Sequence, residues 1–142
     1  MLNISGLDNG VVLDHIPAGK SMDIYKYLDL GKLDCQVAII KNASSKKMGK
    51  KDIIKISGGL DKIDLDVVGF VSHHITVNII ENGTVTEKRE LHHPKRVVNV
   101  IRCKNPRCIT SIEQELPHIF NLTDRATATY RCQYCEEKYT KR

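Results

Sequence analysis

The sequence predicts an α+β protein: a ferredoxin-like antiparallel sheet with two helices on one face, followed by a small β-rich zinc-binding domain. Three observations predict this fold. Residues 10–80 show strand and helix patterns in the order β-α-β-β-α-β, which is the ferredoxin-like order. Asn82-Gly83 is a strong hairpin signal that adds one more strand. Four cysteines then follow near the C-terminus in two close pairs.

The first strand and the first helix are predicted from local composition. Residues 10–16 are rich in β-branched side chains, which favour a strand. We expect the strand to stop at Pro17, because proline has no backbone N–H to donate to a neighbouring strand. Residues 21–30 carry apolar side chains at helical spacing. Gly31 suits the position that follows a helix, so the helix is expected to end there.

The next three elements are predicted between residues 35 and 70. Strand-like stretches at 35–41 and 52–57 are joined by a lysine-rich loop at 46–51. Residues 61–70 place apolar side chains on one helical face and begin with aspartates, which suit the positive end of a helix.

The end of the first domain is marked by a linker. Residues 75–80 form the clearest strand, and the chain returns through 84–86 after the hairpin turn. Residues 91–96 contain two histidines and a proline and have the character of a linker, and residues 97–101 predict a strand that leads into the cysteines. We therefore place the two domains at 1–94 and 95–142.

The charges of the 142-residue chain are divided unevenly between these parts. Residues 1–93 carry 12 basic and 12 acidic side chains, whereas residues 94–142 carry 10 basic and 5 acidic ones. The whole net charge of +5 therefore belongs to the segment that contains the paired cysteines. Either the two parts meet different partners, or the C-terminal part alone meets an acidic one. Because the C-terminal part is short and has few large apolar side chains, we expect a metal to replace part of its core.

The cysteines form a C-x4-C and a C-x2-C pair separated by 23 residues, which predicts a zinc site. Each pair places two thiols on a tight turn, so four sulfurs can converge at a zinc–sulfur distance of about 2.3 Å. Four thiolates leave no open position for water or substrate, so we expect one structural ion per chain. The predicted ligands are Cys103, Cys108, Cys132 and Cys135.

Two other uses of these cysteines are open at this point. Disulfides would need an oxidising compartment, but residues 1–6 do not look like the start of a signal peptide. A redox C-x-x-C would leave the first pair without a role and normally occurs in a thioredoxin-like fold.

The fifth cysteine, Cys35, lies in an apolar stretch and is expected to be buried. With no apolar run of about 20 residues, the protein is expected to be cytoplasmic without a membrane span.

The residues give no positive sign of catalysis. No nucleophile–base motif, P-loop or helix with metal-spaced histidines is present in the sequence. Lys51, Ile53 and Lys55 alternate onto one face of a strand, where the lysines could hold phosphate or ribose oxygens beside a base. The alternative is an edge strand that lysines protect from aggregation.

Several motifs together match one family. They are residues 14–17 (Asp-His-Ile-Pro), residues 48–56 (Met-Gly-Lys-Lys-Asp-Ile-Ile-Lys-Ile), residues 76–78 (Thr-Val-Asn) and the two cysteine pairs. With these motifs the chain resembles the regulatory chain of aspartate carbamoyltransferase over essentially its whole length. The first two motifs are far more specific than the cysteines, which many zinc ribbons share.

The resemblance implies a non-catalytic subunit of an enzyme of pyrimidine biosynthesis. It implies a chain that pairs with itself through the N-terminal domain and with the catalytic chain through the zinc domain. CTP and ATP, with UTP as a further candidate, would bind the first domain. Their binding would shift the catalytic subunits between quaternary states of low and high activity.

The resemblance also implies roles for single residues. Asp14 and Lys55 would contact the ribose and base, and His15 and Lys88 the phosphates, for which lysine is suited as a mobile point charge. Asn105, between the first two cysteines, would meet the catalytic chain. The pocket would be lined by Ile4, Leu7, Val12, Ile53, Asn78, Ile80 and Val85.

Two other functions compete with this interpretation. A nucleic-acid-binding zinc ribbon would use Tyr130, Tyr134 and Tyr139 to stack on bases among the basic residues, although these tyrosines could equally form the small core of the zinc domain. A stand-alone nucleotide-binding enzyme lacks a residue set for any reaction. The resemblance favours a protein partner, with no nucleic acid and no membrane.

Overall fold

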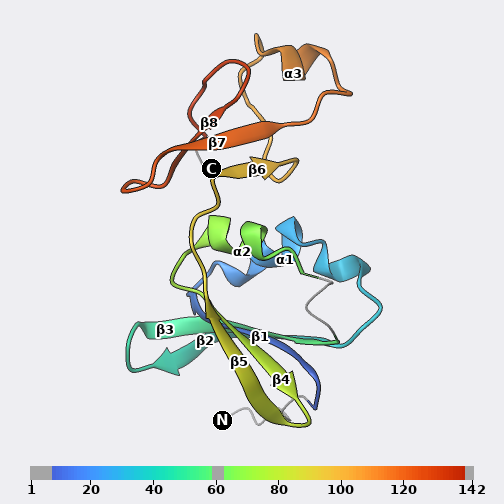
Figure 1. Cartoon of the computed structure of the whole chain (residues 1–142), viewed down its shortest axis with the longest axis vertical. Coiled ribbons are helices and arrows are strands. Elements are labelled where there is room, and N and C mark those ends of the chain that lie inside the picture. The colour runs from blue at the N-terminus through green and yellow to red at the C-terminus, as the bar shows by residue number, and fades with distance from the viewer. Residues whose placement is uncertain (1–7, 59–62, 140–142) are drawn as a thin grey trace. The chain divides into compact units, whose positions relative to one another are not determined.

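The computed structural model describes residues 8–58 and 63–139 (Figure 1). The chain divides into two compact units, one that ends at His92 and one that begins at His93, close to the boundary predicted after residue 94. None of the described helices has the length and apolar character needed to cross a membrane.

The first unit contains a five-stranded antiparallel sheet with two helices on one face (Figure 1). The order of the strands across the sheet is β2-β3-β1-β4-β5. The elements are β1 (Gly10–Pro17), α1 (Ser21–Tyr27), the 3-10 helix η1 (Leu30–Lys32), β2 (Val37–Ser45), β3 (Gly49–Ser57), α2 (Leu65–Val71), β4 (Thr76–Glu81) and β5 (Thr84–Glu90). This arrangement confirms the predicted α+β class.

The period of two in the strands places the core of this unit between the sheet and its helices. Alternate side chains of β1, β3 and β4 point toward the helices, and the residues between them point to the opposite face. Full burial of each aliphatic side chain contributes roughly 1.5–3 kcal/mol of stability. The fully or almost fully buried side chains are Val11, Leu13, Ile16, Ile24, Ile54, Ile56, Val68, Ile75 and Val77.

Helix α1 ends earlier than the sequence predicts. It stops at Tyr27, and Asp29 adopts a left-handed conformation with φ 52°. The chain then forms η1, so Gly31 lies inside the 3-10 helix and does not follow α1 directly. A Cβ atom at Gly31 would lie 2.6 Å from the hydroxyl of Tyr25. Gly31 therefore does not serve a left-handed turn, and a side chain there would have to displace the Tyr25 hydroxyl.

The hairpin between β4 and β5 is confirmed. Asn82 and Gly83 have φ values of 52° and 78°, as a two-residue type I′ turn requires. Strand β5 runs to Glu90, beyond the predicted end at residue 86. Strand β3 likewise begins at Gly49, inside the predicted lysine-rich loop.

Helix α2 begins with a side-chain cap. The carboxylate of Asp64 accepts a hydrogen bond of 3.0 Å from the backbone N–H of Asp66, which satisfies one of the free N–H groups at a helix start. This helix was predicted to begin at residue 61, but residues 59–62 lie outside the described part of the chain.

A buried carboxylate joins three segments of the first unit. Asp52 of β3 is 0% exposed. Its Oδ2 accepts hydrogen bonds from the Ser21 hydroxyl (2.6 Å), the Ser21 N–H (3.3 Å) and the Gly19 N–H (3.1 Å), and its Oδ1 accepts one from the Asn42 N–H (3.0 Å). Burial raises the pKa of Asp52, but these hydrogen bonds outweigh burial and hold the pKa below its ordinary value.

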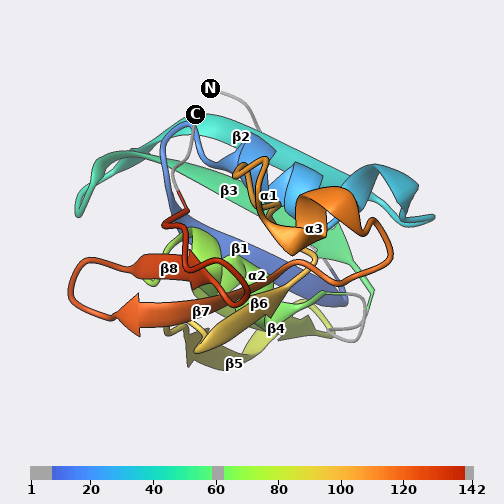
Figure 2. The same cartoon turned by 90° about the horizontal axis from the view of Figure 1, so that it is seen from above.

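The second unit is a three-stranded antiparallel sheet with one short helix. Strands β6 (Arg96–Val98), β7 (Ile119–Asp124) and β8 (Thr129–Cys132) lie side by side in that order (Figure 2). Helix α3 spans Ile109–Ile112. The strand predicted at 97–101 is shorter than expected because Asn99 takes a positive φ of 58° and ends β6.

Two of the three C-terminal tyrosines belong to the core of the second unit. Tyr130 is buried, and its hydroxyl donates a 2.6 Å hydrogen bond to the carbonyl oxygen of Pro94. Tyr139 packs edge-to-face against the buried ring of Phe120, with ring centroids 6.0 Å apart. A buried ring cannot stack on a base, so the nucleic-acid interpretation loses Tyr130, while Tyr139 is half-buried and Tyr134 is 37% exposed.

Candidate functional site

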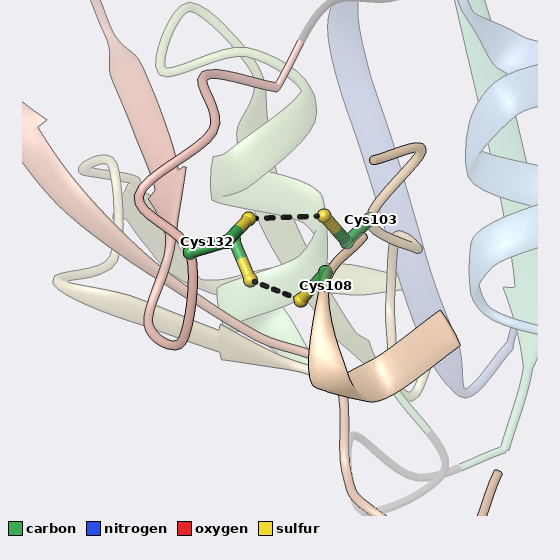
Figure 3. Close-up of side chains that lie close together, drawn as sticks. Cys103, Cys108 and Cys132 are labelled. Atoms are coloured by element: carbon green, nitrogen blue, oxygen red, sulfur yellow. Dashed lines mark hydrogen bonds between the residues drawn. The ribbon is translucent and has the colours of Figure 1, made fainter. Parts of the chain in front are cut away.

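The four cysteines of the second unit form one cluster. Cys103 precedes α3, Cys108 is the residue before α3, Cys132 ends β8 and Cys135 follows β8. Their four Sγ atoms all lie within 4.8 Å of one another. Figure 3 shows the side chains of Cys103, Cys108 and Cys132 converging on a common point.

The cluster has the dimensions of a tetrahedral thiolate site. A tetrahedron with metal–sulfur distances of about 2.3 Å has sulfur–sulfur edges of about 3.8 Å. The Cys103–Cys135 and Cys108–Cys132 sulfurs are separated by 3.5 and 3.7 Å. None of the five cysteines forms a disulfide in the structure, which argues against the disulfide alternative. The two pairs lie in one cluster, which favours a shared metal over a separate redox pair.

Local backbone structure shapes the two cysteine turns. In the first turn, the carbonyl oxygen of Asn105 accepts from the Cys108 N–H (3.0 Å) and the Ser111 hydroxyl (2.7 Å). In the second turn, the Glu136 N–H donates to the carbonyl of Cys132 (2.9 Å), and Glu136 takes a left-handed φ of 64°. These bonds form a tight bend on each side of the cluster.

The electrostatics of the cluster call for a cation. Burial raises the pKa of Cys103 to about 12, with the nearby thiols adding to the effect. Burial also raises the pKa of Cys132. At Cys108 burial acts in the same direction, but hydrogen bonds from the hydroxyl and N–H of Thr110 outweigh it and lower the pKa to about 7. Four thiolates this close would repel one another, so a divalent cation is the natural compensation.

Two neighbours of the cluster were missed by the sequence analysis. The buried hydroxyl of Thr110 lies 3.1 Å from the sulfur of Cys108. The backbone N–H of Cys103 donates to Nδ1 of His118 at 3.4 Å. The C-x4-C spacing identifies only the metal ligands themselves. The residues that hydrogen-bond to the ligands come from the start of a helix and from a distant loop, so the spacing does not reveal them.

A second candidate site lies on the face of the first sheet opposite the helices. Val12 of β1 pairs with Lys55 of β3 on one side and with Asn78 of β4 on the other, and Asn78 pairs with Lys88 of β5. Directly paired residues point to the same face. Neighbouring strands are about 4.8 Å apart, so the backbones of the two lysines are separated by about 14 Å. We call these four residues the cross-sheet row.

An ion pair lies next to the cross-sheet row. The carboxylate of Asp14 lies 2.9 Å from the ammonium of Lys51 and accepts a 2.7 Å hydrogen bond from the N–H of His15. Burial raises the pKa of Asp14, but Lys51 and the His15 N–H outweigh burial and lower it. His15 has a φ of 58°, and its Nδ1 lies 2.9 Å from the hydroxyl of Thr76. Thr76 was not predicted as a site residue.

The cross-sheet row also contains an unsatisfied acceptor. The side-chain oxygen of Asn78 is shielded from solvent and has no hydrogen-bond partner among the described residues. A buried acceptor without a partner is unfavourable by about 1–3 kcal/mol, so a donor from a ligand would be stabilising there.

The remaining predicted site residues have different surroundings. Ile80 is buried on the same face, and Val85, its paired neighbour on β5, is 45% exposed. Ile53 is half-buried on the strand that carries Lys55. Arg89 pairs with Val77 of the core face and bonds to Glu87 at 2.9 Å, so it does not share the face of Lys88. Ile4 and Leu7 lie outside the described residues.

Comparison with known proteins covers both units. Residues 2–92 match the family model described as the aspartate carbamoyltransferase regulatory chain, allosteric domain. Residues 95–142 match the model described as the metal binding domain of the same chain. The second match contains all four clustered cysteines, so this cluster can hold a structural metal.

Individual relatives agree over nearly their full lengths. The aspartate carbamoyltransferase regulatory chain of Clostridium botulinum strain Hall is 52% identical over 140 residues, which are 99% of this chain and 95% of the relative. That of Clostridium tetani is 49% identical over 98% of this chain and 96% of the relative. That of Bifidobacterium longum is 41% identical over 96% and 98%. The chain belongs to the family of aspartate carbamoyltransferase regulatory chains, with an allosteric domain in place of a catalytic one.

Proposed function

We propose that this chain binds nucleoside triphosphates on the open face of its first sheet and thereby modulates the catalytic chains of aspartate carbamoyltransferase in pyrimidine biosynthesis. The effectors are CTP and ATP, with UTP as a further candidate. The observation that carries the proposal is the cross-sheet row, which sets two lysines at opposite ends of a surface with an apolar centre and an unpartnered acceptor.

The chemistry of this face suits a nucleotide. The ionised carboxylate of Asp14 accepts hydrogen bonds from ribose hydroxyls, and Lys55 reaches the same part of the ligand from the neighbouring strand. Lys88 and His15 supply cationic or donor groups for phosphates. Val12, Ile53, Ile80 and Val85 provide apolar contact, together with the predicted lining residues Ile4 and Leu7.

The metal of the second unit is proposed to be one structural Zn²⁺ per chain. Tetrahedral sets of four thiolates select zinc or iron–sulfur chemistry, and this closed set has the spacing of a single ion. When bound, the ion would compensate the charge of Cys103, Cys108, Cys132 and Cys135. It would fix the two cysteine turns, and it would take no part in a reaction.

The partners follow from the two units. The zinc domain, with Asn105 on its first cysteine turn, would bind the catalytic chain, and the nucleotide-binding domain would pair with a second copy of itself. The domain limits for these roles are 1–94 and 95–142. A complex of this kind would work in the cytoplasm.

The two binding functions are expected to be separable by mutation. Lys55→Ala removes a charge-assisted hydrogen bond worth about 1.5–3 kcal/mol, so the affinity for CTP should fall roughly tenfold or more while assembly with the catalytic chain is kept. Asn105→Ala should weaken assembly and leave CTP binding by the isolated chain unchanged. Calorimetric titration of CTP and size-exclusion analysis of assembly measure both effects.

Lys50→Ala is the matched control for the lysine variant. Lys50 lies on the same strand and is exposed, but it has the opposite orientation to Lys51 and Lys55. Equal CTP affinity in Lys55→Ala and Lys50→Ala would show that the nucleotide does not bind on this face of the sheet.

Regulation itself is tested by linkage. If nucleotide binding shifts a quaternary equilibrium, CTP must bind the two quaternary states with different affinities. Titration of CTP into the assembled enzyme, with and without a bisubstrate analogue at the catalytic sites, should give two dissociation constants. Identical constants would make the chain a structural partner without a regulatory role.

A further inference from the structure

Strand β1 contains a bulge at two of the residues proposed to meet the nucleotide. The pairing of β1 with β3 shifts between Leu13 and Ile16. Asp14 and His15 therefore stand together opposite a single residue of β3, Ile53. The φ of His15 is 58°, a left-handed conformation that residues other than glycine seldom adopt. Such a conformation persists only where the surrounding structure holds it, so the bulge needs support from outside β1.

The bulge decides which way the side chains of β1 point. Val12 and Asp14 lie on the open face of the sheet, and plain alternation would place Ile16 there as well. Instead, Ile16 is fully buried in the core between the sheet and its helices. The extra residue in the bulge reverses the alternation after Asp14. A slip of one residue at the end of β1 would remove the bulge and exchange the two faces.

Asp52 of β3 holds the chain directly after this bulge. Its backbone pairs with that of Ile16. Its Oδ2 accepts hydrogen bonds from the Gly19 N–H at 3.1 Å and from the N–H and hydroxyl of Ser21 at 3.3 and 2.6 Å. The segment from Ile16 to Ser21 therefore begins and ends on the same residue of β3. A slip of β1 would pull this segment away from the carboxylate, so these hydrogen bonds keep the extra residue in the bulge.

The same carboxylate supports a second bulge on the other side of β3. The pairing of β2 with β3 shifts between Ile40 and Ala43. Lys41 and Asn42 therefore both stand opposite Asp52. Asn42 has a φ of 60°, and its N–H donates to Oδ1 of Asp52 at 3.0 Å. One side chain thus fixes the register of β3 against both of its neighbours, at the level of Asp14.

Asp52 itself lies where a nucleotide on the open face cannot touch it. It alternates along β3 with Lys51 and Ile53, so it points to the helix side of the sheet. It is fully buried, and one of its donors, Ser21, belongs to helix α1. Any effect of Asp52 on nucleotide binding must therefore act through the residues that it holds in place.

We propose that Asp52 is a positioning residue of the nucleotide site. By holding the chain after the bulge of β1, it keeps the Asp14 carboxylate on the open face, 2.9 Å from the ammonium of Lys51, where it accepts from the hydroxyls of a ribose. This inference rests on the proposed function, because it takes Asp14 as the ribose contact. Loss of Asp52 should therefore impair recognition of the ribose, which a loss of stability alone would not do.

The preference for CTP over 2′,3′-dideoxy-CTP tests the proposal, because the analogue lacks both ribose hydroxyls. In calorimetric titrations of the full-length wild-type chain, CTP should bind about tenfold or more tightly than the analogue, as expected for hydrogen bonds to a charged group. Asp14→Asn should abolish most of this preference, and Asp52→Asn should reduce it by at least about threefold. The double variant should show no less preference than Asp14→Asn alone, because both changes act through one contact.

Val68→Ala is the matched control for lost stability. Val68 is a fully buried residue of helix α2 and lies outside both bulged strands. Its truncation destabilises the same core, but it should leave the preference for CTP within about twofold of the wild-type value. Urea titration shows how much stability each variant loses, and circular dichroism shows that each is folded during the titrations.

Ser21→Ala is a milder test of the same contact. It removes the 2.6 Å hydrogen bond and leaves the carboxylate and its backbone donors in place. It should lower the preference for CTP in the same direction as Asp52→Asn, by a smaller factor. Should Asp52→Asn fail to fold, Ser21→Ala takes its place in every comparison.

Four outcomes would overturn the inference. If Asp52→Asn keeps the wild-type preference for CTP, Asp52 serves the fold alone, and the proposed function stands. If Val68→Ala loses the preference as strongly as Asp52→Asn, the effect belongs to stability. If the wild-type chain binds CTP and the dideoxy analogue equally well, Asp14 is not the ribose contact, although nucleotide binding stands. If the wild-type chain binds no CTP, the inference and the proposed function both fall.

Discussion

Replacing Cys132 with alanine is expected to unfold the second unit and to abolish capture by the catalytic chain. Cys132 is a buried member of the four-thiol cluster. Structural zinc contributes about 10–16 kcal/mol of apparent binding free energy in small domains. The few buried side chains of this unit, Val97, Ile101, Phe120 and Tyr130, contribute roughly 1.5–3 kcal/mol each by burial, about 6–12 kcal/mol together. The conformational entropy lost on ordering some 45 residues, about 1–2 kcal/mol per residue for the backbone alone, far exceeds that sum, so the unit needs the metal.

The measurement is hydrogen exchange of residues 95–139, together with the zinc content of the purified chain. Exchange should become fast in Cys132→Ala and remain slow in the first unit. Cys35→Ala is the matched control, because Cys35 is a free thiol of the first unit outside the cluster. A zinc-free protein that still assembles with the catalytic chain would show that the metal is dispensable.

Asp52→Asn is expected to destabilise the first unit by about 3 kcal/mol at neutral pH. The amide presents an NH₂ group where one carboxylate oxygen now accepts, so donors from Ser21, Gly19 or Asn42 lose their acceptor inside the protein. The variant keeps the shape of the side chain, which separates the loss of hydrogen bonds from the creation of a cavity.

This destabilisation should depend on pH in a defined direction. The folded-state pKa of Asp52 is lower than the ordinary value of 3.8. The ionised carboxylate therefore contributes its full stability above that value, and the contribution is lost as the pH falls through the folded-state pKa. The difference in unfolding free energy between the wild-type chain and Asp52→Asn should be constant from about pH 5 to 7 and shrink below about pH 4.

Urea titration followed by hydrogen exchange of residues 37–57 measures this difference at each pH. Asp34→Asn is the control, since Asp34 is exposed and forms no ion pair with another described residue. A difference that is the same at pH 3 and pH 7 would mean that the charge of Asp52 is not what joins the three segments.

The order of elements in the first unit could be predicted because its signals are local. Alternation along β1 and β3, the aspartates before α2 and the Asn82-Gly83 turn each specify structure within a few residues. Element ends were less accurate, because they depend on distant atoms. Gly31 follows apolar residues at helical spacing, yet α1 stops at Tyr27, before the left-handed Asp29.

The second unit was predicted far less completely. The strands Ile119–Asp124 and Thr129–Cys132 and the helix Ile109–Ile112 were not predicted. These segments are short and have no clean periodicity, and their conformation depends on the cysteine cluster and the rings of Phe120 and Tyr130. Metal-ligand spacing identified the cluster because it needs only the chemistry of thiols and turns.

The candidate nucleotide face shows the same limit. Lys51 and Lys55 were assigned to one face by alternation, but the ion pair of Lys51 with Asp14 depends on pairing between β1 and β3. Likewise Lys88 and Arg89 cannot be distinguished by composition. Only the register of β5 against β4 shows that Lys88 shares a face with Asn78.

The cross-sheet row takes one side chain from each of four strands, Lys55, Val12, Asn78 and Lys88. A slip of one residue in any of these strands would turn its side chain to the other face, so a ligand of the row binds the folded sheet and not the unfolded chain. Such a ligand at 100 times its dissociation constant adds about 2.7 kcal/mol to the free energy of unfolding. The cellular nucleotide pool would then also govern how long the first unit resists proteolysis and turnover, whatever its effect on catalysis.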